Sequence, residues 1–168
     1  MSAFPEGNAI VYCEGAYGTP NGKTAHGLVR RCARYRVICV VDSHFRGRDA
    51  GSMLDGKTRG VPIVASVQEA VRSAERWGGR ATHLVVGLAP DGGRLGARAR
   101  EDIKTAVRLG LNVDCGLHDF LGEDEGIARL AGQKGVTIRD VRKPPPRSRL
   151  HFFSGKIEQV QVLKIAVL

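Results

Sequence analysis

Short apolar runs alternate along this chain with segments in which apolar residues recur every three or four positions. The runs predict buried β-strands, and the three-to-four spacing predicts helices with one apolar face. Strands are predicted over 9–13, 36–42, 61–65, 82–88, 111–115 and 136–141. Helices are predicted over 23–32, from a cap at Ser66 to Gly78, and over 97–109 and 123–134, with a single helical turn over 49–54.

Strands that alternate with helices at this spacing are typical of βαβ units. We therefore predict a doubly wound α/β domain with a mostly parallel, Rossmann-like sheet. The glycine-rich and polar loops 15–22, 42–48, 87–94 and 116–119 all follow predicted strands. Ligands of such folds bind beyond the carboxyl ends of the strands, so these loops are the expected site.

The end of the chain has a different character. Residues 1–141 make up the predicted domain, and 142–149 (RKPPPRSR) form a basic, proline-rich stretch typical of a linker. Residues 150–168 end in VQVLKIAVL, which predicts a strand over 160–168 with nothing after it. We expect this to be the first strand of a truncated second domain.

Charge and composition narrow the function. The chain has 168 residues and a formal net charge of +9, with arginines spread along its length and few aromatic residues to stack bases. This pattern does not favour nucleic-acid binding, and it fits the binding of an anionic small molecule. There is no signal peptide and no apolar run of membrane-spanning length, so we expect a cytoplasmic protein. The four cysteines lack metal-ligand spacing, and we expect no metal site.

The strongest candidate site is the stretch AIVYCEGAYGTPNGKTAHGLVR, residues 9–30. A strand leads into a loop with Gly15, Gly18 and Gly22, and Lys23 and Thr24 then open a helix. Glycines allow close backbone approach, and a helix N-terminus favours negative charge. We predict that this loop binds a phosphate-bearing ligand.

Two phosphate-binding motifs fail here. GxxxxGK[ST] needs glycine at position 17, which is Tyr17, and the glycines do not follow GxGxxG. Asp42 closes the second strand 20 residues after Gly22, where an acid could meet a ribose; it could equally cap the turn that follows. His118 and Asp119 are adjacent and point in different directions, so no catalytic residue is assigned.

Four sequence blocks carry a family resemblance: EGAYGTPNGKTAHGLVR, VVDSHFRGRDAGSMLDGKTRGVPIVASVQEA, GLAPDGGRL and GLNVDCGLHDFLGED. Together they resemble the N-terminal Rossmann-like domain of the domain-of-unknown-function 1611 family, D-glutamate N-acetyltransferase-like proteins. That resemblance implies a following P-loop domain, entered by a strand like VQVLKIAVL, which could bind a nucleotide with Mg²⁺. Because the predicted strand reaches the last residue, we expect the glycine loop of that P-loop domain to lie beyond this sequence.

A looser likeness concerns GVPIVASVQEAV and the strand and proline loop after it. These are similar to the CoA-binding Rossmann domains of the succinyl-CoA synthetase type. The likeness implies that Gly15, Gly18 and Gly22 hold CoA phosphates and that Ala89 and Pro90 line the cofactor. The glycine spacing differs between the two.

Together the resemblances imply one half of an amino-acid N-acetyltransferase that uses acetyl-CoA. The residues expected to hold phosphates lie in one loop: Gly18, Thr19, Pro20, Gly22, Lys23 and Thr24. Asp42 or Arg46 would meet the ribose. These 168 residues alone are expected to be inactive.

Two other functions stay open. The domain could be a non-catalytic module that docks against its own P-loop domain or builds a homo-oligomer. It could also bind NAD(P), although the sequence contains no recognisable hydride-transfer site.

Overall fold

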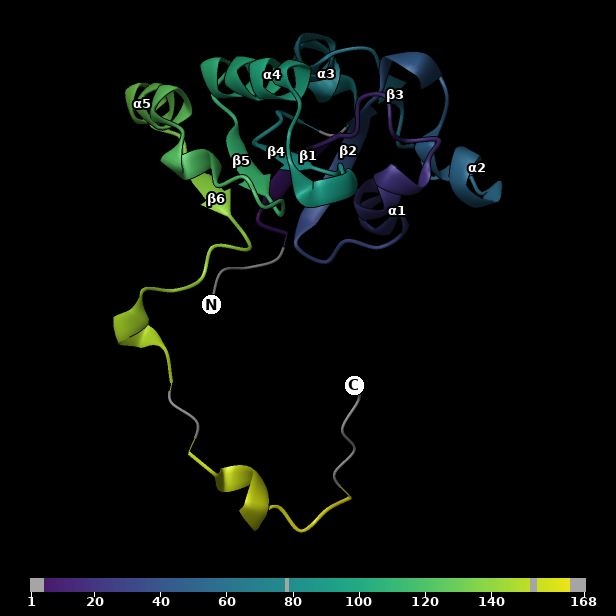
Figure 1. The fold of residues 1–168 in the computed structure, drawn as a ribbon. Coiled ribbons are helices and arrows are strands. Elements are labelled where there is room, and N and C mark those ends of the chain that lie inside the picture. Colours follow the sequence, from purple (N-terminus) through teal and green to yellow (C-terminus); the bar gives the residue numbers. More distant parts are fainter. Residues whose placement is uncertain (1–4, 78, 152–153, 164–168) are drawn as a thin grey trace.

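The computed structural model describes residues 5–77, 79–151 and 154–163. Figure 1 shows one twisted sheet with helices on both of its faces. All strand pairs are parallel, in the order β3-β2-β1-β4-β5-β6. The strands are β1 (Gly7–Tyr12), β2 (Tyr35–Val41), β3 (Ile63–Val64), β4 (His83–Val86), β5 (Asn112–Cys115) and β6 (Ile138–Asp140). The predicted doubly wound, Rossmann-like class is confirmed.

The helices divide between the two faces. They are α1 (Lys23–Arg30), α2 (Ala50–Asp55), α3 (Val67–Ser73), α4 (Ala97–Arg108) and α5 (Glu125–Lys134). In Figure 1, α3, α4 and α5 cover one face, while α1 and α2 lie on the other, over the β1–β3 half. On that second face, the described residues place no helix over β5 and β6.

The strand order reverses between β1 and β4. From β1 the chain winds outward through β2 and β3, crosses over with α3, and then winds the other way through β4, β5 and β6. At the carboxyl ends of β1 and β4, where Tyr12 lies beside Val86, the following loops diverge. This topological switch point is where open α/β sheets form their ligand crevice.

Local signals explain most element boundaries. Asp49 caps α2 by accepting a hydrogen bond from the Ser52 N–H, and Ser66 caps α3 in the same way through the Glu69 N–H. Gly135 ends α5 with a φ of 64°. The cap at Ser66 and the stop at Gly135 were expected from the residue types.

The strand predicted at the C-terminus is not seen in the part of it that the structure describes. Of the strand expected over 160–168, residues 160–163 are described and form no strand, and 164–168 lie outside the described residues. Val162 and Leu163 are 69% and 86% exposed, so no neighbouring strand or face covers them. β-propensity alone does not form a strand without a partner.

No described helix has the length and apolar character that a membrane span requires.

Candidate functional site

A crevice of about 410 Å³ opens at the switch point. Its apolar floor comes from the end of β4 and from the loops after β4 and β5. Polar groups from three elements surround this floor. The lining residues are Lys23, Thr24, Val86, Leu88, Ala89, Pro90, Gly92, Gly93, Gly116, Leu117, His118 and Arg142. Its volume is in the range of small-molecule sites.

Backbone hydrogen bonds fix the start of α1 against β4. The Ala25 N–H donates to the Gly87 carbonyl at 3.0 Å, and the Ala89 N–H donates to the Asn21 carbonyl at 2.7 Å. These bonds hold Lys23 and Thr24 at one wall of the crevice.

The opposite wall is fixed from β5. The His118 N–H donates to the Gly93 carbonyl at 2.8 Å, and Asp119 accepts a 2.6 Å hydrogen bond from the Leu95 N–H. Asp119 also pairs with Arg100 at 3.1 Å. Because Asp119 is occupied in this way, it ties the loop after β4 to the loop after β5 and does not form an acid–base pair with His118.

The glycine loop is packed against itself. A Cβ on Gly18 would lie 2.6 Å from the Phe45 ring, and one on Gly22 would lie 2.6 Å from the Ala16 carbonyl. Gly15 has a φ of 70°. A side chain at Gly18 or Gly22 would clash with a neighbour, and one at Gly15 would strain the backbone.

Several amides of this loop already donate to acceptors within it. N–H groups of Ala16, Thr19 and Gly22 donate to loop carbonyls, and the Lys23 N–H donates to the Pro20 carbonyl. The side chain of Thr19 accepts from the Asn21 N–H and caps the short 3-10 turn that begins at Pro20. Of the predicted loop contacts, only Lys23 and Thr24 line the crevice.

Tyr17 occupies the position where a P-loop would need glycine. Its side chain is 1% exposed and its hydroxyl donates to the Ala50 carbonyl at 2.8 Å. Its ring meets His26 edge-on, with 5.1 Å between the ring centroids. Burial raises the pKa of Tyr17. Tyr17 therefore anchors the loop to α2.

Asp42 lies beneath the loop, fully buried. One carboxylate oxygen accepts the Tyr17 N–H at 2.9 Å, and the other accepts the His44 N–H at 3.0 Å. This is the turn-cap arrangement, one of the two predicted from sequence. Because Asp42 is fully buried, a ribose could reach its carboxylate only if the surrounding loops moved.

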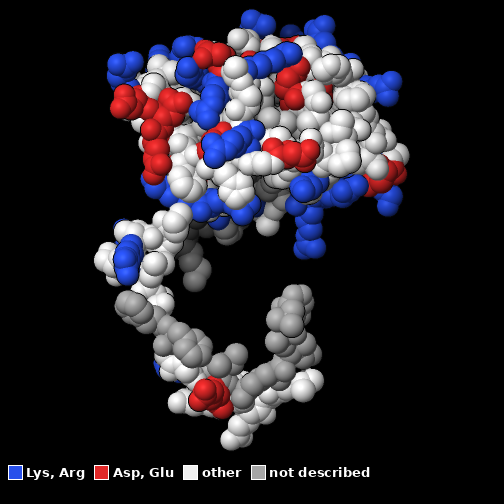
Figure 2. Space-filling view, viewed as in Figure 1, with Lys and Arg blue, Asp and Glu red and all other residues white. Residues whose placement is uncertain are grey.

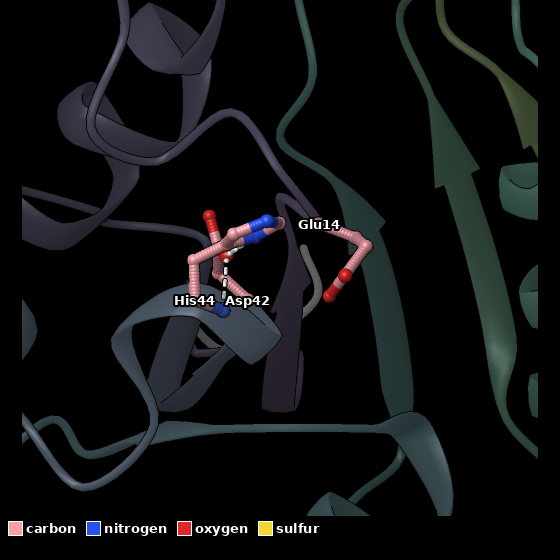
Figure 3. A group of neighbouring side chains, drawn as sticks. All are labelled: Glu14, Asp42 and His44. Atoms are coloured by element: carbon pink, nitrogen blue, oxygen red, sulfur yellow. Dashed lines mark hydrogen bonds and ion pairs between the residues drawn. The ribbon is translucent and has the colours of Figure 1, made fainter.

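Glu14 joins Asp42 and His44 in a compact group (Figure 3), whose candidate ligand atoms lie within 4.8 Å of one another. Such a set could in principle hold a cation. However, Glu14 accepts hydrogen bonds from the Ser43 N–H at 2.8 Å and the Ser43 hydroxyl at 2.5 Å, and pairs with Arg98 at 2.8 Å. The carboxylates are thus satisfied by protein groups, and the group joins the loops after β1 and β2.

Arg46 and Pro90, the remaining predicted contacts, lie apart. Pro90 lines the crevice. Arg46 pairs with Glu69 at the start of α3 at 2.9 Å and lines a different hollow beside β3. The structure therefore brings together Lys23, Thr24 and Pro90, and leaves Arg46 outside.

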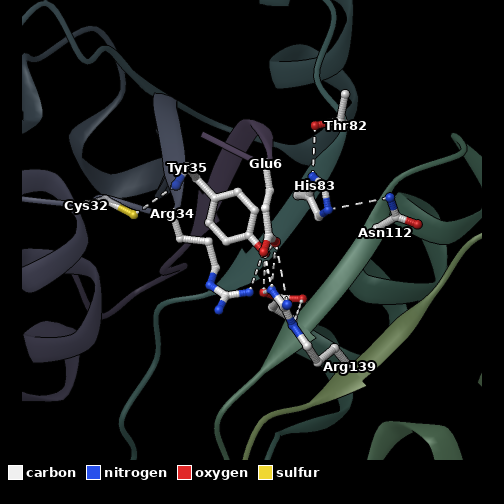
Figure 4. Close-up of polar contacts among 9 residues, drawn as sticks. Glu6, Cys32, Arg34, Tyr35, Thr82, His83, Asn112 and Arg139 are labelled. Atoms are coloured by element: carbon white, nitrogen blue, oxygen red, sulfur yellow. Dashed lines mark hydrogen bonds and ion pairs between the residues drawn. The ribbon is translucent and has the colours of Figure 1, made fainter. Parts of the chain in front are cut away.

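A second polar group lies on the sheet face that α1 and α2 leave bare (Figure 4). The Tyr35 hydroxyl donates to Asp114 at 2.5 Å, and Arg139 contacts both Asp114 and Tyr35. Glu6 pairs with Arg34 at 2.7 Å and with Arg139 at 3.4 Å. Burial lowers the pKa of His83, whose ring lies tilted against that of Tyr35, with 4.8 Å between the centroids. Each carboxylate of this network pairs with an arginine of the same network.

Charged side chains of both signs cover the visible face of the domain. Figure 2 shows lysine and arginine side chains interspersed with acidic ones over its upper part, and several basic side chains along its lower edge.

Sequence reasoning gave no role to two polar residues of the crevice, His118 and Arg142. His118 was set aside as half of an adjacent pair, and Arg142 was placed in the linker. The available signal was their position, since each follows the carboxyl end of a strand of a predicted parallel sheet.

Comparison with known proteins gives a solved structure of the same fold and a relative by sequence. A crystal structure of a DUF1611 family protein from Anabaena variabilis ATCC 29413 matches with a TM-score of 0.68 and 29% identity, over 83% of this chain and 38% of that one. A protein named D-glutamate N-acetyltransferase, from Tritonibacter scottomollicae, is 33% identical over 61 residues, 36% of this chain and 18% of that protein. The chain thus spans well under half the length of both relatives.

A family model supplies the assignment. The model of a Rossmann-like domain of unknown function, DUF1611_N, matches residues 43–144, more than half of the chain. That segment runs from the loop after β2 to the turn after β6, and so includes both loops that form the far wall of the crevice. The chain belongs to the DUF1611_N family of Rossmann-like domains.

Proposed function

We propose that this chain is the cofactor-binding part of an enzyme that N-acetylates an amino acid, with acetyl-CoA as the acetyl donor and a D-glutamate-like acceptor. The observation that carries the proposal is the crevice at the switch point, with Lys23 and Thr24 at one wall and an apolar floor. The name of the Tritonibacter relative supports the choice of acetyl transfer and of D-glutamate.

The crevice has the chemistry that CoA requires. CoA combines several phosphates with a long, largely uncharged pantetheine arm. Lys23 and Thr24 offer a cation and a hydroxyl for a phosphate, and Leu88, Pro90 and Leu117 offer an apolar surface for the arm. Acetyl-CoA would bring a thioester. An amine that attacks its carbonyl carbon forms the C–N bond of the amide as the C–S bond breaks, and CoA leaves as the thiol with the proton that the amine loses.

The other predicted residues of the glycine loop act by shaping the loop, not by contacting the ligand. Gly18, Thr19, Pro20 and Gly22 shape the turn that delivers Lys23, and Asp42 holds that turn from below. In this proposal they position the phosphate contacts and do not make them.

Calorimetry on the 168-residue chain tests this proposal. Acetyl-CoA should bind, NAD should not, and Lys23→Ala should weaken binding about tenfold because a charge-assisted contact is lost. Arg31→Ala, an exposed cation beyond the other end of α1, is the matched control and should leave the affinity unchanged. If acetyl-CoA gives no heat, the proposal fails; heat from NAD would favour the redox class.

A second candidate is a non-catalytic docking or oligomerisation module. The bare face of β5 and β6 favours it, because parallel sheets are normally covered on both faces. This candidate predicts no affinity for acetyl-CoA and a concentration-dependent mass in analytical ultracentrifugation, which Arg139→Ala should alter. A monomer at all concentrations that binds acetyl-CoA would rule it out.

A further inference from the structure

Arg142 is held at the crevice by a turn. The Val141 N–H donates to the Cys115 carbonyl at 2.8 Å, and the Lys143 N–H donates to the Asp140 carbonyl at 3.1 Å. These two bonds fix the backbone on either side of Arg142, although the residue opens the proline-rich stretch 142–149.

The two cations of this turn have different surroundings. Lys143 pairs with Glu123 at 3.0 Å and approaches the Phe120 ring, 6.0 Å from its centroid. Arg142 lines the crevice, and no described acidic side chain pairs with it.

The crevice has an unbalanced charge. Lys23 comes from the start of α1 and Arg142 from the turn after β6, and Lys23 too lacks an acidic partner among the described residues. The lining contains no carboxylate. Asp119, next to the lining residue His118, is occupied by Leu95 and Arg100. Two like charges that line one cavity are stabilised by an anion bound in it.

We propose that Lys23 and Arg142 form a two-cation seat for a phosphate group, a diphosphate or a dianionic phosphate ester, and that the proline-rich stretch thereby becomes part of the site. This proposal rests on the proposed function, because both place the ligand in the same crevice. It does not require that the ligand is acetyl-CoA. Arg142 suits this chemistry because its planar guanidinium can donate two parallel hydrogen bonds to a phosphate, while Lys23 acts as a point charge.

A consequence concerns the segment after β6. Because Arg142 is its first residue, a phosphate bound to Arg142 and Lys23 bridges this segment to α1. Occupancy of the crevice then restrains the segment where it leaves the domain.

Calorimetry with inorganic diphosphate as the probe, at low and moderate salt, tests the seat. Wild-type protein should bind diphosphate, with an affinity that falls as salt rises. Lys23→Ala and Arg142→Gln should each weaken binding about tenfold. Arg142→Lys should recover part of the loss, and Lys143→Ala should match wild type. Both seat residues are exposed, so circular dichroism should show unchanged folding.

Two further probes separate the sources of the phosphate. Adenosine 3′,5′-bisphosphate represents the nucleotide end of CoA, and orthophosphate represents a free phosphate. Tighter binding of the bisphosphate with the same dependence on Arg142 would assign the seat to a nucleotide. Tighter binding of orthophosphate would assign it to a small phosphate.

The failures of the two proposals are distinguishable. Acetyl-CoA binding that is insensitive to Arg142→Gln overturns the seat and leaves the proposed function standing. Diphosphate binding that depends on Arg142, with no heat from acetyl-CoA, supports the seat and overturns the cofactor. If none of the phosphate probes binds, the seat is wrong.

Discussion

The Asp42 carboxylate organises the glycine loop from below, since it accepts backbone hydrogen bonds from Tyr17 and from His44. From sequence, an acid at the end of the second strand could be a ribose contact or a turn cap. The difference depends on how closely the loops after β1 and β2 approach each other. That approach is set by Tyr17 and Phe45 packing between them, which spacing along the chain does not reveal.

Replacing Asp42 tests this arrangement. Asp42→Ala leaves the buried Tyr17 N–H without its acceptor, so the free energy of unfolding should fall by about 2–3 kcal/mol. Urea denaturation measures the change. Asp91→Ala is the control, because Asp91 is exposed and should change stability by less than about 0.5 kcal/mol. Equal effects of both variants would show that Asp42 does not hold the loop.

Cysteine reactivity offers a second test at this scale. Cys13, Cys39 and Cys115 are buried, and burial raises the pKa of the first two to about 12 and of the third to about 11. Cys32 is half-buried. Because the thiolate is the reactive form, raised pKa values leave the buried three as inert thiols at pH 8.

Ellman's reagent at pH 8 should therefore titrate Cys32 alone in the folded protein and all four thiols in guanidinium chloride. Raising the pH toward 9 should not expose the other three while the protein stays folded. Rapid reaction of two or more thiols in the native state would contradict the packing around β1, β2 and β5.

Among the secondary-structure elements, the contact between α1 and β4 shapes the crevice. Gly87 makes it possible: a Cβ there would lie 2.7 Å from both the Ala25 Cβ and the Val11 Cγ1. The missing side chain lets α1 lie close enough to donate its Ala25 N–H to the Gly87 carbonyl.

Gly87→Ala should push α1 away from β4 and lower the free energy of unfolding by about 1–3 kcal/mol. Gly27→Ala, within α1 with open space around its Cα, should instead raise it by about 0.5–1 kcal/mol. Thermal unfolding of the two variants gives the comparison. A neutral Gly87→Ala would mean that the close approach does not constrain α1.

The sequence predicted the helices and strands well where apolar periodicity and caps agree, as at Ser66 and Gly135. All of its strands except the one over 111–115 ran a residue or more too long at their carboxyl ends, as at Ala65 and Val141. Pairing with a neighbour, and not apolar character, decides where a strand ends. The same reason accounts for residues 160–163, whose β-branched residues lack a partner strand among the described residues.

At the scale of the whole molecule, the sheet order determines the site. The sequence predicted that the loops after the strands would meet, and Lys23, Thr24 and Pro90 do meet in the crevice. It could not show that several glycine-loop amides donate within the loop, or that Arg46 pairs with Glu69 beside β3. It also could not show that Arg142 turns back to the crevice, since that depends on the hydrogen bond from the Val141 N–H to the Cys115 carbonyl at the end of β5. The contacts of Arg46 and Arg142 are tertiary, and the loop bonds depend on the local path of the backbone.

The central claim is that the switch-point crevice binds a phosphate-bearing cofactor. The most direct measurement is a titration of ¹⁵N-labelled protein with acetyl-CoA, followed by backbone amide NMR. Shifts should concentrate at the crevice, on Lys23–Ala25, Ala89–Gly93, Gly116–His118 and Arg142. Shifts confined to Tyr35, Asp114 and Arg139 on the bare sheet face, or no shifts at saturating acetyl-CoA, would contradict it.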